Sequence, residues 1–134
     1  MDEASLEVFR SRALQLTNAM RLCSEDCPSY ASAVALLAVH SAISYNDALC
    51  IRLLGERPKG KDHKDAIPLV TRACKKARIA PDGIKHLERL LSAKTAISYG
   101  DRVVNTEHAQ KLSTTAERFV KWVEDNLTDK RRAQ

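Results

Sequence analysis

Three polar residues, His40, Ser44 and Asp47, lie on successive turns of a long apolar segment that spans residues 31–54. On an α-helix this spacing places all three side chains on one face. An imidazole, a hydroxyl and a carboxylate could form a nucleophilic relay, although their order in the chain does not indicate the geometry of a hydrolase. The alternatives are a hydrogen-bonded network in the core or a contact between two copies of the chain, because buried polar groups need partners.

Positive charge is concentrated directly after this segment. The chain has a formal net charge of +5, and residues 52–64 contain Arg52, Arg57, Lys59, Lys61 and Lys64 against only Glu56 and Asp62. We expect this connection to attract phosphate groups. No glycine-rich phosphate loop accompanies it, so the sequence does not favour ATP or NAD chemistry, and no cofactor is expected. Aromatic residues do not alternate with the basic ones, so sequence-specific readout of bases is not expected either.

The four cysteines do not form the pattern of a metal site. Cys23 and Cys27 are the only close pair, and no second Cys or His pair lies near them in the sequence. Cys50 and Cys74 fall in apolar helical registers, where cysteine behaves as a small hydrophobic residue. No Glu is followed three residues later by His, as a di-iron helical bundle requires. We therefore expect free thiols and no bound metal.

Apolar residues recur at alternating spacings of three and four, which is typical of helices with one buried face. The pattern predicts helices over 2–23, over 29–54, from near Asp65, over 84–99, and from Asn105 or Thr106 onward. Either Asp62 or Asp65 can cap the third of these helices. A start near Asp65 is favoured, because it would place Pro68 in about the first turn, where its missing N–H costs little. No segment alternates apolar and polar residues as a strand does. The prediction is an all-α, up-and-down four-helix bundle with an additional short helix.

The chain is expected to form one domain over residues 1–127, followed by a flexible basic tail over residues 128–134. No apolar run free of polar and charged groups reaches the length of a membrane span, so no membrane contact is expected. The sequence begins with Met1, Asp2 and Glu3 rather than with the basic segment of a signal peptide. These features predict a soluble, cytoplasmic protein.

Two further segments carry a resemblance to a known family. Residues 42–48, which are rich in small side chains, lead into a Gly-Glu-Arg-Pro-Lys-Gly-x-x-His hairpin over residues 55–63. Later in the chain, the sequence Ser98-Tyr99-Gly100-Asp101 precedes a helix whose spaced apolar residues are Ala109, Ala116, Phe119 and Val123. This order of parts, which covers about residues 31–126, resembles the HEPN family of helical domains. The resemblance implies a helical bundle that binds nucleotides or RNA.

Many HEPN proteins are metal-independent RNases that carry an Arg followed a few positions later by His. Arg102 and His108 are similar to that pattern and are the catalytic candidates. A neutral imidazole can take a proton from a ribose 2′-hydroxyl while a guanidinium holds the scissile phosphate. The chain departs from the family pattern at Val103, where active members usually have a polar residue, and at Ser98, where the related branch can place an Arg. The alternative is that Arg102 and His108 are ordinary surface residues.

The resemblance implies partners, and together with the basic connection it indicates binding residues. Binding candidates are Asn46, Asp47, Arg57, Lys59, Lys61, His63 and Tyr99. Expected partners are a second copy of the chain, a small protein of the nucleotidyltransferase type, and RNA. Three hypotheses follow: a non-catalytic, dimerising HEPN-like module that binds protein, nucleotide or RNA; a metal-independent endoribonuclease, as in toxin–antitoxin pairs; and a general helical protein-interaction module.

Overall fold

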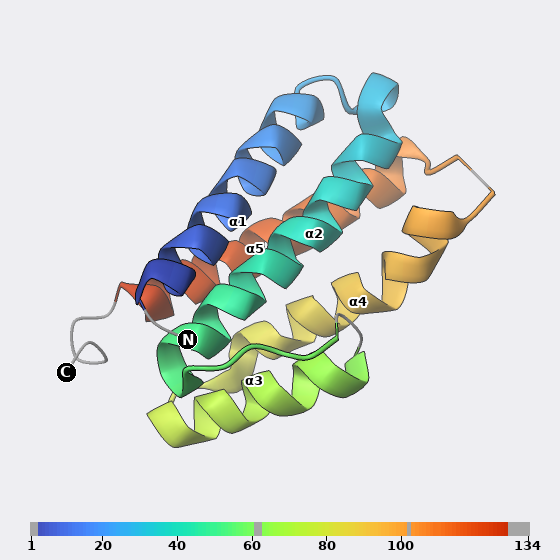
Figure 1. Cartoon of the computed structure of the whole chain (residues 1–134). Helices are drawn as coiled ribbons and strands as arrows, with labels where there is room; N and C mark the ends of the chain where they lie inside the picture. Colours follow the sequence, from blue (N-terminus) through green and yellow to red (C-terminus); the bar gives the residue numbers. More distant parts are fainter. Residues whose placement is uncertain (1–2, 61–62, 102, 129–134) are drawn as a thin grey trace.

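The computed structural model describes residues 3–60, 63–101 and 103–128, and these are helical with no strand among them (Figure 1). The α-helices are α1 (Glu3–Ser24), α2 (Cys27–Leu54), α3 (His63–Ala77), α4 (Ile84–Tyr99) and α5 (Thr106–Leu127), and a single 3₁₀ turn, η1 (Pro81–Gly83), precedes α4. The all-α prediction is therefore confirmed. Residues 129–134, most of the expected basic tail, lie outside the described residues.

Most helix boundaries agree with the sequence pattern, and two differ. The helix α2 begins at Cys27 rather than at Ser29, and Tyr30 interrupts it with non-helical backbone angles. The helix α3 begins at His63, so Pro68 lies beyond its first turn and the predicted start near Asp65 is wrong. Pro68 lies on an exposed face, where water can bind the carbonyl group that loses its N–H donor.

The helix α2 is the core of the molecule. It contacts each of the other four α-helices, and most of its residues from Ala31 onward are buried. Figure 1 shows α1, α2 and α5 running alongside one another, with α3 and α4 across the other side of α2. The helix ends at Gly55, whose φ of 71° is the left-handed conformation of a typical glycine C-cap. A helix that is apolar around most of its circumference is thus enclosed by its neighbours.

Small side chains allow the other helices to approach α2 closely. Its buried alanines are Ala31, Ala35, Ala38, Ala42 and Ala48. The predicted apolar face of α5 is buried against it through Ala109, Leu112, Ala116, Phe119 and Val123. The close approach that the alanines permit is therefore used for packing within the chain.

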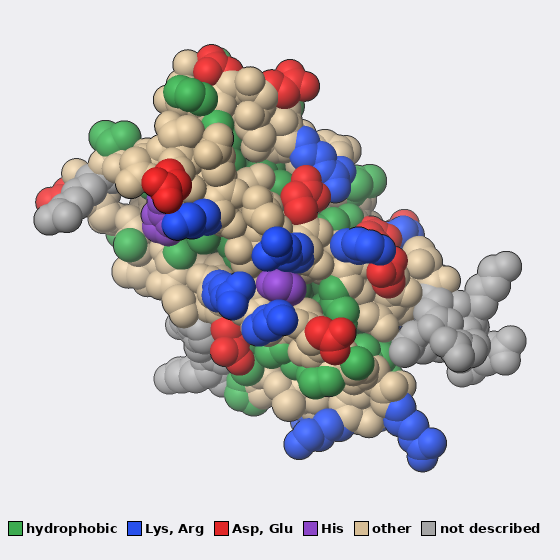
Figure 2. Space-filling model, turned by 180° about the vertical axis from the view of Figure 1, so that it is seen from behind, with side chains coloured by type: hydrophobic (Ala, Val, Ile, Leu, Met, Phe, Trp, Pro, Cys, Tyr) green, Lys and Arg blue, Asp and Glu red, His purple; other side chains and the backbone are tan. Residues whose placement is uncertain are grey.

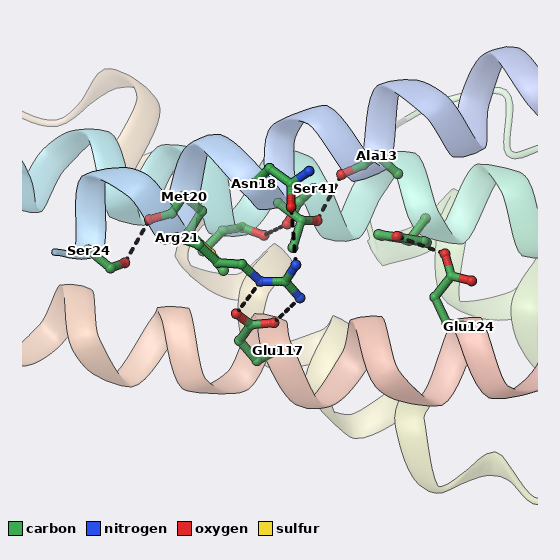
Figure 3. Close-up of polar contacts among 11 residues, drawn as sticks. Ala13, Asn18, Met20, Arg21, Ser24, Ser41, Glu117 and Glu124 are labelled. Atoms are coloured by element: carbon green, nitrogen blue, oxygen red, sulfur yellow. Dashed lines mark hydrogen bonds and ion pairs between the residues drawn. The ribbon is translucent and has the colours of Figure 1, made fainter.

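Two ion pairs join α1 to α5 along this packing. The guanidinium of Arg21 donates two hydrogen bonds of 2.8 Å to the carboxylate of Glu117 (Figure 3). Further along, Arg10 donates to Glu124 at 2.7 Å. The Tyr45 hydroxyl of α2 also donates to Glu124, at 2.8 Å. Because Tyr45 is fully buried, Glu124 provides the hydrogen bond that its hydroxyl needs.

The first turn of α4 is pressed against α5. A Cβ built on Gly83 would overlap the indole ring of Trp122, so only glycine fits between the two helices at this point. The indole N–H of Trp122 donates to the carbonyl oxygen of Ala80 at 3.2 Å. At the other end of the pair, the Asn105 side chain caps α5 by accepting from the backbone N–H of His108 at 2.7 Å. The start of α4 thus lies against the end of α5, and the two helices run antiparallel.

By length and composition, α2 is the one described helix that could cross a membrane. Its most apolar stretch is 83% buried inside the bundle. Core helices of soluble proteins share this property, so the observation does not assign the chain to a membrane.

Candidate functional site

An open groove of about 890 Å³ runs between α4 and α5. It is lined on one side by Arg89, Ser92 and Ala93, and on the other by α5 residues that include His108, Lys111 and Arg118. Figure 2 shows the molecule from behind, where histidine side chains lie among Lys and Arg side chains on one face. The groove thus combines an imidazole with a surplus of positive charge.

Two arginines supply most of the free positive charge in the groove. Arg89 and Arg118 are both exposed, and neither forms an ion pair with any residue that the structure describes. Lys111 differs, because its ammonium group lies 3.3 Å from the Glu107 carboxylate. Unpaired guanidinium groups on facing helices are suited to binding phosphate oxygens through two parallel hydrogen bonds.

His108 lies in the first turn of α5 and lines this groove. Its side chain is exposed, so it is accessible to a ligand. Arg102, the other catalytic candidate, lies outside the described residues. Tyr99 ends α4 with 83% of its surface exposed, and it does not line the groove.

His86 lies beside the groove rather than among the residues that line it, and the sequence analysis did not select it. It lies one helical turn before Arg89 on α4, and its Nδ1 atom is buried with no hydrogen-bond partner among the described residues. Burial and then the positive charges of Lys85, Arg89 and Arg118 hold the pKa of His86 below its ordinary value. The imidazole is therefore neutral near pH 7. The signal available in the sequence was the spacing of His86 and Arg89, which places both on one helix face.

Asn46 and Asp47 lie in the core and not on the groove. They are 1% and 6% exposed, and they adjoin a cavity of about 10 Å³ beside Pro58 and Gly60. Such a cavity has room for no more than a single water molecule. Ser44 is buried as well, and His40 is partly buried. Ser44, Asn46 and Asp47 are therefore enclosed within the protein rather than displayed to a ligand.

The basic connection between α2 and α3 is partly engaged in contacts of its own. The Arg57 guanidinium lies 4.8 Å from the centre of the Phe9 ring, and that of Arg12 lies 5.2 Å from it. A second pocket, of about 440 Å³, includes Arg57 and Lys59 together with acidic residues. Lys61 lies outside the described residues, and His63 is the first residue of α3.

The Cys50 thiol does not add a reactive site. Burial and the negative charge of Asp47 raise the pKa of Cys50 well above its ordinary value, which keeps the thiol protonated and unreactive. The described residues contain no group of three or more His, Cys, Asp or Glu side chains that could hold a metal ion.

No protein-family model matches the chain, and no curated protein matches it. The groove is therefore interpreted from its own chemistry.

Proposed function

We propose that this chain is a non-catalytic HEPN-like domain that binds RNA through the groove between α4 and α5. In this proposal the fold is an up-and-down four-helix bundle with an additional short helix, and the protein acts in the cytoplasm as a homodimer. The observation that carries the proposal is the pair Arg89 and Arg118, which face one groove from two helices without ion-pair partners among the described residues. Phosphate contacts of this kind supply most of the affinity of non-specific nucleic-acid binding.

The cationic side chains of the groove favour this proposal over a general protein-interaction module. For such a module we would expect an exposed apolar groove. Here three Lys or Arg side chains and two threonines line the groove, together with one carboxylate and apolar carbon atoms, and no Phe, Tyr or Trp is among the lining residues. The expected mode of binding therefore follows the phosphate backbone and depends little on base sequence.

The test is the affinity of the protein for a fluorescent single-stranded RNA of mixed sequence, measured by anisotropy at several salt concentrations. An Arg89→Ala, Arg118→Ala double variant is expected to bind at least about tenfold more weakly than the wild type and to show a shallower dependence on salt. The matched control is a Lys75→Ala, Lys76→Ala variant, which removes the same charge from the exposed end of α3. The proposal is wrong if the wild type does not bind at low salt, or if the two variants bind equally.

One observation favours a second function, a metal-independent endoribonuclease: His108 lies in the same groove as the unpaired arginines. In that hypothesis His108 takes the proton from the ribose 2′-hydroxyl and Arg102 holds the phosphate. Incubation of labelled RNA with the protein in EDTA separates the two functions. Cleavage by the wild type that disappears in an Arg102→Ala, His108→Ala variant would establish the nuclease. Binding without cleavage supports the non-catalytic proposal.

A further inference from the structure

The contact between Gly83 and Trp122 fixes which residues of α4 and α5 face each other. Because the helices run antiparallel from this contact, one turn along α4 leads to His86 and one turn back along α5 leads to Arg118. A further turn of α4 leads to Arg89, which lines the groove together with Arg118. His86 and Arg89 of α4 are thus brought close to Arg118 of α5, near Trp122.

The positive charges around His86 repel one another and favour the binding of an anion. Among the described residues, the groups that act on the imidazole are Lys85 and Arg89 from α4 and Arg118 from α5, and all three are positive. These charges are all of one sign. Because Nδ1 of His86 is buried, with no hydrogen-bond partner among the described residues, an anion in the groove could reach the ring only through its other nitrogen, Nε2. A bound phosphate group would neutralise the repulsion between the arginines and would accept a hydrogen bond from a protonated imidazole.

We propose that His86, Arg89 and Arg118 form a subsite for one phosphate group, and that His86 takes up a proton when the phosphate binds. The inference rests on the proposed function insofar as this phosphate belongs to bound RNA. By linkage, an anion that favours the protonated imidazole must bind more tightly as the pH falls through the range in which His86 titrates. Affinity for RNA would then be higher in mildly acidic solution than at neutral pH.

The test follows the proton resonances of the imidazole rings by NMR as the pH is lowered, with sulfate as the probe. Sulfate is tetrahedral like phosphate, but its charge does not change between about pH 5 and pH 8, so any pH dependence belongs to the protein. A His86→Gln variant assigns the signal. Replacing chloride by sulfate at equal ionic strength is expected to raise the titration midpoint of His86 by about one pH unit.

Arginine variants separate anion binding from a general salt effect. In an Arg89→Gln, Arg118→Gln variant, the His86 midpoint should already be higher in chloride, because two repelling charges are gone, and it should no longer respond to sulfate. Both substituted side chains are exposed in the wild type, and circular dichroism confirms that the variant is folded. A His86 midpoint that sulfate does not move in the wild type would overturn the inference, as would an equal response in the variant.

Measurements with RNA separate this inference from the proposed function. If sulfate moves the His86 midpoint but single-stranded RNA does not bind, the phosphate subsite stands and the RNA-binding function fails. If RNA binds while neither RNA nor sulfate affects the His86 signal, the RNA-binding function stands and the subsite fails. If both are correct, RNA affinity should rise about tenfold between pH 7.5 and pH 5.5 in the wild type and should stay nearly constant in His86→Gln.

Discussion

Glu124 has a different environment from Glu117, although both accept hydrogen bonds from an arginine of α1. Glu124 also accepts from the hydroxyl of Tyr45, which is fully buried. We expect Glu124→Ala to lower the free energy of unfolding by about 2 kcal/mol, because it leaves that hydroxyl buried without a partner. Urea unfolding followed by circular dichroism measures the change.

Glu117→Ala is the matched control for this prediction. It removes the same side chain from the same helix, but the Arg21–Glu117 pair is more exposed, with side-chain exposures of 48% and 38%. Exposed ion pairs contribute little, so a cost of about 0.5 kcal/mol is expected. Equal losses in the two variants would show that Tyr45 does not depend on Glu124.

His86 should make the stability of the protein depend on pH. Its pKa is lower in the folded state, through burial and the charges of Lys85, Arg89 and Arg118, than in the unfolded chain. Above the unfolded-state pKa, near 6.5, the imidazole is neutral in both states. As the pH falls below that value, the unfolded chain binds the proton more readily, so the folded state loses stability.

The prediction is a comparison of melting temperatures in chloride buffers. Between about pH 7.5 and pH 5, the melting temperature of the wild type should fall further than that of His86→Gln, which lacks the titrating group. An equal fall in melting temperature in the two proteins would contradict the interpretation that folding lowers the pKa of His86.

Helix α4 keeps its position on α5 because Gly83 leaves room for the indole of Trp122. We expect Gly83→Ala to cost about 2 kcal/mol in thermal or urea unfolding, because a well-packed contact cannot accept another methyl group without strain. The backbone angles of Gly83 are ordinary helical ones, so crowding alone would explain the loss. When Trp122 is replaced by Leu, which removes the indole ring, Gly83→Ala should lower the free energy of unfolding by less than it does in the wild type.

Gly55→Ala provides a contrast at the end of α2. The space around Gly55 is open, but its φ is 71°, so the cost there comes from backbone strain and is about 1 kcal/mol. Replacing Trp122 should not change that cost, since a Cβ at Gly55 would meet no neighbouring atom within 4 Å. If replacing Trp122 changed the cost of Gly55→Ala, the packing at Trp122 would be energetically coupled to the end of α2.

The helices could be predicted from the sequence, but the groove could not. Apolar residues at helical spacing identify each buried face locally, which is why the face of α5 from Ala109 to Val123 agreed with the structure. The groove depends on which turn of α4 lies against which turn of α5. Nothing in the local pattern gives that register, so Arg118 and His86 were not selected, whereas His108 was found only through a resemblance.

At the level of the whole molecule, the proposal includes a homodimer, although the groove itself is formed by one chain. The alanines of α2 that could have served a second copy are mostly buried within the bundle, so a dimer must use outer surfaces. Light scattering after size-exclusion chromatography is expected to give twice the mass of one 14.9 kDa chain. A mass of one chain at every concentration up to about 100 μM would contradict the homodimer, because physiological association is tighter than that.

The enclosure of α2 by the other four helices has a consequence for how the chain folds as it is synthesised. The ribosome produces α2 second and α5 last among the described helices. Until α5 emerges, a long apolar surface of α2 has no cover, and such surfaces promote aggregation. The native structure of this domain must therefore form only after α5 has been synthesised.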